Sequence, residues 1–179
     1  SASALAGSRT GLFAGVSTTD YRDLAQQAAV AGGLVADRST YAFMLANRVS
    51  NLLDIHGPSE AIDTACSSSL IAIRRAVESM RQGNCDAALV GGVNLIFNPQ
   101  VVVTASRAGM LSEDGRCKTF DKAANGYVRG EGVGVLLLKP LSRAQTDGER
   151  IHGLIVGSAE THGVRASSPS APKPVAQKA

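Results

Sequence analysis

The sequence predicts an α/β fold with a mixed, largely parallel sheet, and three observations lead to this prediction. Two apolar runs without alternation, Gly11–Val16 and Ala87–Ile96, are typical of strands that are covered on both faces. Amphipathic stretches with helical spacing lie between these runs. A strand, a helix and a strand follow one another between residues 62 and 96, which is the order of a parallel crossover unit. With 179 residues, 44% of them hydrophobic, the chain can bury one sizeable core.

The first part of the chain is predicted to hold one strand and two helices. Gly11–Val16 forms the strand, and Asp20 then serves as the N-cap of a helix that Gly32-Gly33 closes. The second helix spans Thr40–Leu53 and ends before His56-Gly57-Pro58. Four apolar residues form its predicted buried face: Tyr41, Leu45, Val49 and Leu52.

The next strand leads into a helix through a cysteine. The strand is predicted at Ile62–Ala65, Cys66 follows it, and a run of three serines opens the helix. The apolar stripe of this helix consists of Leu70, Ile73, Val77 and Met80. Gly83-Asn84 ends the helix, and the buried strand Ala87–Ile96 comes directly after it.

The remaining chain has a weaker pattern. Residues Asn98–Arg129 are rich in turn residues and predict a long loop with short elements, which makes this loop a candidate for lining a site. Two further strands are predicted at Val133–Lys139 and His152–Ser158, with a polar turn at Gln145–Glu149 between them. The proline-containing end, Arg165–Ala179, receives no element. The total is about five strands and three helices in alternating order.

The composition excludes several classes of function. Lys and Arg (18) exceed Asp and Glu (15) by only three, without a basic run interleaved with aromatics, so no nucleic-acid partner is expected. No apolar run approaches the roughly 20 residues that span a bilayer, and we therefore expect a cytoplasmic protein without a membrane partner. Cys66, Cys85 and Cys117 are odd in number and lack CxxC spacing, which predicts reduced thiols and neither a disulfide framework nor a zinc site.

The position predicted for Cys66 has a chemical use. The first N–H groups of a helix lack intrahelical partners and the helix dipole is positive there, so a cysteine at a helix start is favoured as thiolate. A thiolate is the nucleophilic form of cysteine. The alternative is that Cys66 is a small buried hydrophobic residue, which is the more common role of an intracellular cysteine.

The octet Asp63-Thr64-Ala65-Cys66-Ser67-Ser68-Ser69-Leu70 resembles the nucleophile motif of the β-ketoacyl synthase (ketosynthase) family and looks like its modular type I polyketide synthase branch. The later motifs are similar in sequence to those of synthases that make polyketides or hybrid polyketide–peptide products. The resemblance runs from about Arg9 to about Gln177. The supporting motifs are Gly57-Pro58-Ser59, Gly91-Gly92-Val93-Asn94, Gly115–Asp121 and Asn125–Gly132.

This resemblance implies a thiolase-like fold and a decarboxylative Claisen condensation in polyketide or fatty-acid-like biosynthesis. Cys66 is the implied catalytic residue, which accepts an acyl chain as a thioester while its own backbone N–H helps to hold the developing oxyanion. The implied partner is an acyl carrier protein whose phosphopantetheine arm delivers acyl and malonyl thioesters. The chain itself is expected to bind no cofactor and no metal, and the full-length parent is expected to be a homodimer.

The family also uses two histidines, in motifs resembling HGTGT and GHxxAAAG, and neither motif occurs here. His56 falls in a helix-ending turn and His152 at a strand start, so structural or surface roles are expected for both. His162 lies in a segment that follows the first strand of the second half-domain in the family, and it is not expected to be catalytic.

The sequence is therefore interpreted as an N-terminal and central fragment, a partial β-ketoacyl synthase domain over residues 1–179. Residues of about 9–150 would form the N-terminal half, and residues 151–179, with the first strand of the C-terminal half, would start the second half. Without that second half, the apolar face of the Cys66 helix is expected to be exposed and the isolated chain to be poorly stable. Such a fragment is expected to become acylated and not to condense.

Other residues and other classes of function are alternatives to this interpretation. Glu131 is more plausible as a solvated or ion-paired carboxylate than as a general base, and Cys117 is more plausible as incidental than as reactive despite Arg116 and Lys118 beside it. Gly91-Gly92 lacks a nucleotide-binding pattern. A non-condensing ketosynthase-like interaction or structural domain, or a gene remnant, is the main alternative. Thiolase or chalcone-synthase-like chemistry on coenzyme A fits the serine run poorly.

Overall fold

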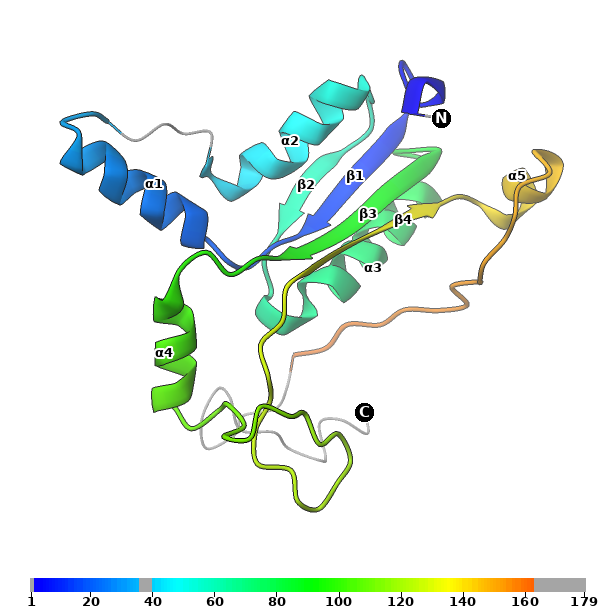
Figure 1. The fold of residues 1–179 in the computed structure, drawn as a ribbon. Coiled ribbons are helices and arrows are strands. Elements are labelled where there is room, and N and C mark those ends of the chain that lie inside the picture. The colour runs from blue at the N-terminus through cyan, green and yellow to red at the C-terminus, as the bar shows by residue number, and fades with distance from the viewer. Residues whose placement is uncertain (1, 36–39, 163–179) are drawn as a thin grey trace.

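The computed structural model describes residues 2–35 and 40–162. These residues form a four-stranded sheet with helices around it (Figure 1). The strands are β1 (Thr10–Gly15), β2 (Ser59–Ile62), β3 (Ala87–Asn94) and β4 (Gly132–Leu138). The α-helices are α1 (Asp20–Ala31), α2 (Ala42–Leu53), α3 (Ser68–Arg81), α4 (Pro99–Arg107) and α5 (Leu141–Thr146), and the short 3-10 helices are η1 (Ala2–Ala4) and η3 (Ala65–Ser67).

The sheet has the order β2-β1-β3-β4 and is mixed. Strands β2, β1 and β3 run parallel, whereas β4 runs antiparallel to β3. In this register Gly15 of β1 lies beside Ile62 of β2 on one side and Gly92 of β3 on the other. The carboxyl ends of the three parallel strands therefore meet at one edge of the sheet, and the predicted fold class is confirmed.

Two helices cover the opposite faces of the parallel strands, because neighbouring residues of a strand point to opposite faces. Phe13 and Val90 pack with Ala72 and Ala76 of α3 in one buried cluster. On the other face, Leu12 packs with Ala46 of α2 and with Ile55. Figure 1 shows α2 and α3 on the two sides of the sheet. The strands that were predicted from continuous apolar runs are buried because helices cover both faces of the sheet.

Small residues, and not the large apolar residues predicted from the sequence, form the buried faces of α2 and α3. Ala46 and Ser50 are buried on α2, and Leu53 packs beside them, whereas the predicted face of Leu45, Val49 and Leu52 is partly or fully exposed. On α3 the buried residues are Ser68, Ala72, Ala76 and Ser79. Ile73 and Met80 pack at the margin of that face, while Leu70 is exposed. Small side chains allow a helix axis to approach the sheet closely. The buried face of each helix is therefore the one with alanine and serine, and not the stripe of large apolar residues that was predicted.

Several predicted boundaries also need correction. Thr19, and not Asp20, is the N-cap of α1, and the buried Asp20 side chain instead accepts the backbone N–H of Asn98 at 3.4 Å. The strand predicted at Ile62–Ala65 lies earlier, at Ser59–Ile62. It pairs with β1 over these four residues, and the chain then turns away toward α3.

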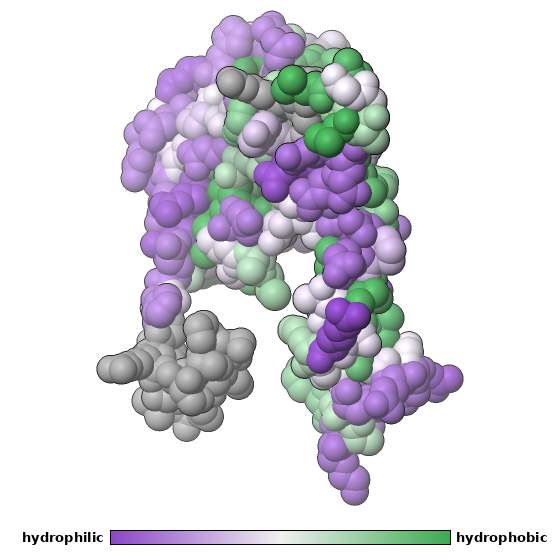
Figure 2. Space-filling view, turned by 90° about the vertical axis from the view of Figure 1, so that its left-hand side faces the viewer, coloured by the Kyte–Doolittle hydropathy of each residue, from purple (hydrophilic) through white to green (hydrophobic). Residues whose placement is uncertain are grey.

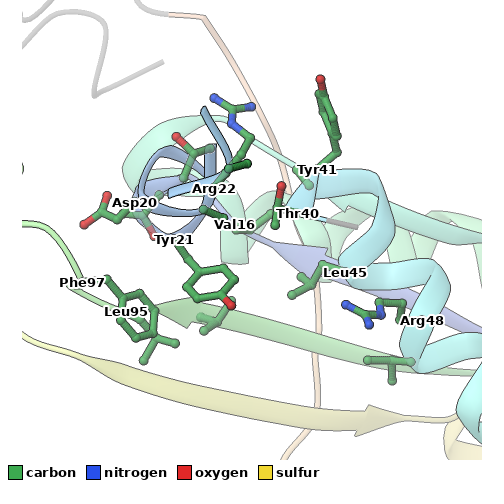
Figure 3. Close-up of a pocket in the computed structure, with 17 residues that line it drawn as sticks. Val16, Asp20, Tyr21, Arg22, Thr40, Tyr41, Leu45, Arg48, Leu95 and Phe97 are labelled. Carbon is green, nitrogen blue, oxygen red and sulfur yellow. The ribbon is translucent and has the colours of Figure 1, made fainter. Parts of the chain in front are cut away.

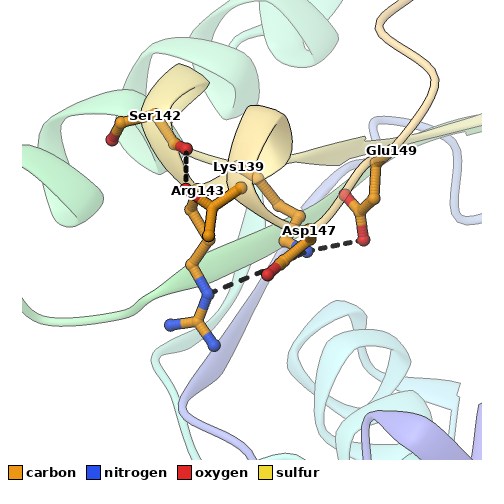
Figure 4. A network of polar contacts seen from close by, with 6 residues as sticks. Lys139, Ser142, Arg143, Asp147 and Glu149 are labelled. Atoms are coloured by element: carbon orange, nitrogen blue, oxygen red, sulfur yellow. Dashed lines mark hydrogen bonds and ion pairs between the residues drawn. The ribbon is translucent and has the colours of Figure 1, made fainter.

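Helices α4 and α5 were not predicted from the sequence. The Asn98 side chain accepts the backbone N–H of Gln100 at 2.9 Å, and Pro99 follows it, so α4 has an N-cap signal inside the segment interpreted as a loop. Helix α5 covers most of the segment before the predicted polar turn, and a network of ion pairs joins the residues on its two sides. In this network Lys139 Nζ lies 2.9 Å from Asp147 Oδ2 and 2.6 Å from Glu149 Oε1 (Figure 4).

The strand predicted at His152–Ser158 is wrong. Residues 151–162 have no regular secondary structure, and Leu154 and Val156 are exposed. Apolar character alone does not make a strand, because the N–H and C=O groups of a strand need a neighbouring strand. One contact ties this segment to α3, where Glu160 Oε2 lies 3.2 Å from Arg74 Nε. The predicted end segment Arg165–Ala179 lies outside the described residues.

Candidate functional site

Cys66 lies in the middle of η3, in the short connection between β2 and α3, and its side chain is exposed. Ala65, directly before it, has a φ of 55°, which places a residue with a Cβ in the left-handed region. That conformation costs a non-glycine residue about 1–2 kcal/mol. The sequence prediction of a thiol at a strand-to-helix turn is therefore confirmed, whereas the alternative of a small buried residue is wrong.

Polar side chains on both sides of Cys66 hold the turn. The Asp63 carboxylate accepts the backbone N–H of Ala65 at 3.0 Å, which is the bond of an Asx turn. The Ser67 hydroxyl donates to the Thr64 carbonyl oxygen at 2.9 Å and lies at the same distance from the Thr64 hydroxyl. Local side-chain bonds of this kind replace the ladder bonds that the backbone lost at the end of β2.

Two glycines allow the start of α3 to sit directly on the carboxyl edge of the sheet. A Cβ atom at Gly15 would lie 2.7 Å from the backbone nitrogen of Ser69 and 2.8 Å from the carbonyl carbon of Ser68. A Cβ atom at Gly92 would overlap the Ser69 hydroxyl. At Gly15 the close atoms belong to the backbone of α3, so only glycine permits the approach there, and β1 thereby positions the first turn of α3. Cys66 is held directly before the first turn of α3.

The three histidines do not assemble around this cysteine. His56 lies at the opposite, amino-terminal edge of the sheet, where its backbone N–H bonds to Ser8 O at 2.8 Å and its exposed ring lies 3.1 Å from Asp54. His152 and His162 are exposed in the segment after α5. Within residues 2–35 and 40–162, no hydrogen bond joins a histidine to Cys66.

The other candidate residues have structural partners. Glu131 is exposed, as expected for a solvated carboxylate, and it accepts the backbone N–H of Ile96 at 2.6 Å, which ties the start of β4 to the end of β3. Cys117 is exposed, and its sulfur accepts the backbone N–H of Val128 at 3.1 Å. Gly91 and Gly92 lie inside β3 and form no phosphate-binding loop. These contacts support structural roles for Glu131, Cys117 and the glycine pair.

A polar network organises the long segment between α4 and β4. Lys118 Nζ lies 2.6 Å from Asp114 Oδ2 and 2.6 Å from Asn125 Oδ1. The hydrogen bond from Lys118, and then that from Ser112, lowers the pKa of Asp114. Leu111 also bridges to Tyr127, so both ends of the segment are joined. The segment is thus an ordered loop, as its turn residues predicted.

A groove of about 890 Å³ lies between α1, α2 and the end of β3 (Figure 3). Tyr21 of α1 stacks edge-to-face on Phe97 at 5.7 Å, and Leu45 and Val49 of α2 line the other wall. From the side of α1, Figure 2 shows apolar side chains open to the surface between polar ones. Cys66 does not line this groove. This groove was not predicted from the sequence, because its wall is the α2 face that was predicted to be buried.

Residues 1–144 match the family model of the N-terminal domain of beta-ketoacyl synthases. The chain belongs to the β-ketoacyl synthase family. Polyketide synthase PksN of Bacillus subtilis (strain 168) is 49% identical over 177 residues, which are 99% of this chain and 3% of PksN. The resemblance stated from the motifs is confirmed.

Two solved ketosynthases share the fold. The ketosynthase from module 6 of the bacillaene synthase from Bacillus subtilis 168 is 35% identical, with a TM-score of 0.86 over 96% of this chain and 29% of that chain. The oxazolomycin ketosynthase domain OzmH KS7 of Streptomyces albus JA3453 is 42% identical, with a TM-score of 0.77 over 84% of this chain and 27% of that chain. The thiolase-like fold is therefore confirmed, and the chain spans under a third of a solved ketosynthase.

The residues that the structure describes hold neither a candidate metal site nor a candidate membrane-spanning helix. No group of three or more His, Cys, Asp or Glu residues that could hold a metal ion occurs in this part of the chain. Within the same residues, every helix is too short or too polar to cross a membrane.

Proposed function

We propose that this chain is the cysteine-bearing part of a ketosynthase of polyketide biosynthesis and that Cys66 accepts an acyl chain as a thioester. The observation that carries the proposal is the exposed thiol of Cys66, which a strained turn holds at the start of α3. The polyketide synthases among the relatives support the biosynthetic context. In this proposal residues of about 9–150 are the N-terminal half of the domain, and residues 151–179 begin the second half.

The proposed step is a thioester exchange. The Cys66 thiolate attacks the carbonyl carbon of an acyl thioester carried on the phosphopantetheine arm of an acyl carrier protein. A tetrahedral oxyanion forms, and the backbone N–H of Cys66 donates to it. The carrier thiolate then leaves and takes up a proton, while the acyl group remains on Cys66. The phosphopantetheine belongs to the carrier protein, and the chain supplies the nucleophile.

Condensation is assigned to the larger parent protein. The parent would join the Cys66-bound acyl group to a malonyl thioester with loss of carbon dioxide. Since none of the hydrogen bonds in residues 2–35 and 40–162 links a histidine to Cys66, the acid and base groups for that step are proposed to come from elsewhere in the parent. A homodimeric parent and a cytoplasmic location complete the proposal.

Intact-protein mass spectrometry tests acylation. The polypeptide that contains this chain is incubated with an acyl N-acetylcysteamine thioester, and one acyl group is expected to be added per chain. Cys66→Ala should remove the adduct, whereas Cys117→Ala, at the other exposed cysteine, should retain it. Folded protein without an adduct, or an adduct that survives Cys66→Ala, would overturn the proposal.

A non-condensing interaction domain is the second candidate, because no hydrogen bond among the described residues joins a histidine to Cys66. Malonyl thioester added to the acylated polypeptide separates the two functions. Carbon dioxide release with formation of a β-ketoacyl product would identify a condensing enzyme. A stable acyl-Cys66 without either product would identify the non-condensing form.

A further inference from the structure

Three serines follow Cys66, and the structure separates one of them from the others. Ser67 and Ser69 are exposed, whereas Ser68 is only 5% exposed. Its hydroxyl accepts the backbone N–H of Thr64 at 2.9 Å and donates to the carbonyl oxygen of Ala65 at 2.7 Å. Ser68 therefore holds one backbone group of each of the two residues that precede Cys66.

The two bonds fix the strained part of the turn. Thr64 has φ −130° and ψ 35°, and Ala65 has a φ of 55°, so the chain reverses its direction within these two residues. An alanine leaves the left-handed region readily unless its surroundings hold it there. A single hydroxyl can accept one bond and donate another, which an alkyl side chain cannot do. The hydroxyl of Ser68 closes this turn from the inside.

The backbone of Ser68 is itself fixed. Its carbonyl carbon packs against Gly15 of β1, where a Cβ atom would lie 2.8 Å away. One turn further along the same face of α3, Ala72 is fully buried against the sheet. Ser68 thus connects the exposed turn that carries the thiol to the part of α3 that packs against the sheet.

We propose that Ser68 is the positioning residue of Cys66, holding Thr64 and Ala65 so that the thiol stays at the first turn of α3. This inference rests on the proposed acyl transfer to Cys66. Ser68 does not touch the reacting atoms, and its effect is on the rate at which a bound thioester is attacked. Losing its hydroxyl should therefore lower the maximal acylation rate more than the affinity for the thioester.

The test compares variants of the polypeptide that contains this chain. Ser68→Ala removes both hydrogen bonds, and Ser68→Thr keeps the hydroxyl. Ser79→Ala is the matched control, because Ser79 lies on the same helix, is 8% exposed and loses one bond, to the Cys85 thiol at 3.4 Å. Acylation of Cys66 is followed by peptide mass at increasing concentrations of acyl N-acetylcysteamine thioester, and each variant is also melted.

Ser68→Ala is expected to lower the maximal acylation rate at least tenfold while the half-saturating thioester concentration stays within threefold. Ser68→Thr should recover at least a third of the wild-type rate, and Ser79→Ala should reduce the melting temperature without changing acylation. An unchanged rate in Ser68→Ala, an equal loss in Ser79→Ala, or no recovery in Ser68→Thr would overturn the inference while wild-type acylation still stands. No acylation of the wild-type protein would instead overturn the proposed function and this inference with it.

A second variant keeps the test decisive if Ser68→Ala does not fold. Ala65→Gly places glycine at the left-handed position, where it carries no Cβ penalty. In the Ala65→Gly background, removal of the Ser68 hydroxyl should cost at most threefold in acylation rate, because the turn no longer depends on it. A loss of tenfold or more in the Ala65→Gly background would contradict the proposed positioning role.

Discussion

Strands β1 and β4 lie in one sheet and are separated only by β3, yet their surroundings differ completely. All six residues of β1 are buried, whereas β4 is exposed along nearly its whole length. Both strands are apolar and glycine-containing in sequence. The difference comes from the neighbouring layers, because α2 and α3 cover the two faces of β1. Only Leu138 of β4 packs against a buried cluster.

This difference separates a region whose strands are covered by helices from a region that presents apolar surface. The covered region contains β1, β3 and the start of α3, and it positions Cys66. The exposed region contains β4, with Val133, Val135, Leu136 and Leu137 open to solvent, and the segment after α5. Exposed apolar surface was expected on the Cys66 helix, where Leu70 is 70% exposed, and it also extends along β4. Apolar patches of this kind mark interaction sites or aggregation liabilities.

Truncating one large side chain in each strand should give the largest contrast. Phe13→Ala in β1 removes a side chain that is 1% exposed and should lower the free energy of unfolding by about 3–5 kcal/mol. Leu137→Ala in β4 removes one that is 52% exposed and should lower it by less than about 1 kcal/mol. Urea denaturation of both variants measures the difference. Equal losses would mean that β4 is as well covered as β1.

A glycine in each strand provides the second contrast. Gly15→Ala places a methyl group 2.7 Å from the Ser69 backbone nitrogen, so α3 must shift, at a cost of about 1–3 kcal/mol in the free energy of unfolding. It should also slow acylation of Cys66. Gly134→Ala in β4 adds the same group where no atom lies within 4 Å, and it should change both quantities little. A neutral Gly15→Ala would contradict the close approach of α3 to the sheet.

A charge on the exposed strand should change association rather than folding. Val135→Lys is expected to reduce the binding of the dye ANS and the tendency to self-associate, because it interrupts the apolar surface of β4. The free energy of unfolding should change by less than about 0.5 kcal/mol. Fluorescence titration and analytical ultracentrifugation at several protein concentrations measure these effects. Unfolding by Val135→Lys would show that this face is covered.

The smallest effect is expected at the ion-pair network beyond β4. Contact with Glu149, and then with Asp147, raises the pKa of Lys139 above 10.5, and contact with Lys139 lowers the pKa of Asp147 below 3.8. The stabilising contribution of Asp147 is therefore present above about pH 4 and is lost as the pH falls through its folded-state pKa. That of Lys139 is present below pH 10.5 and is lost as the pH rises through its folded-state pKa.

Lys139→Met, which keeps the aliphatic stem, tests this network. The difference in urea midpoint between wild type and Lys139→Met should be constant from pH 5 to pH 9 and should shrink on both sides of that range. Lys122→Met removes the same charge from an exposed loop position and is the control. A difference that does not depend on pH would show that the stem of Lys139, and not its charge, stabilises the end of β4.

Local patterns in the sequence were sufficient for the elements with unambiguous signals. The runs around Phe13 and Val90 predicted buried strands, because continuous apolar character requires cover on both faces. The motif around Cys66 predicted the turn and, together with the supporting motifs, the family. These features depend on residues that are close together in the chain.

The tertiary structure decided the features that depend on distant partners. Periodicity showed that α2 is amphipathic, but the packing of Ala46 against Leu12 decided which side is buried. Residues 152–158 have the composition of a strand and lack a neighbouring strand among the described residues, so they remain without regular structure. Three serines follow Cys66 in the sequence, and the packing of α3 against the sheet decides that Ser68 is the buried one. Local sequence sets what an element can be, whereas burial is a property of the surfaces that meet.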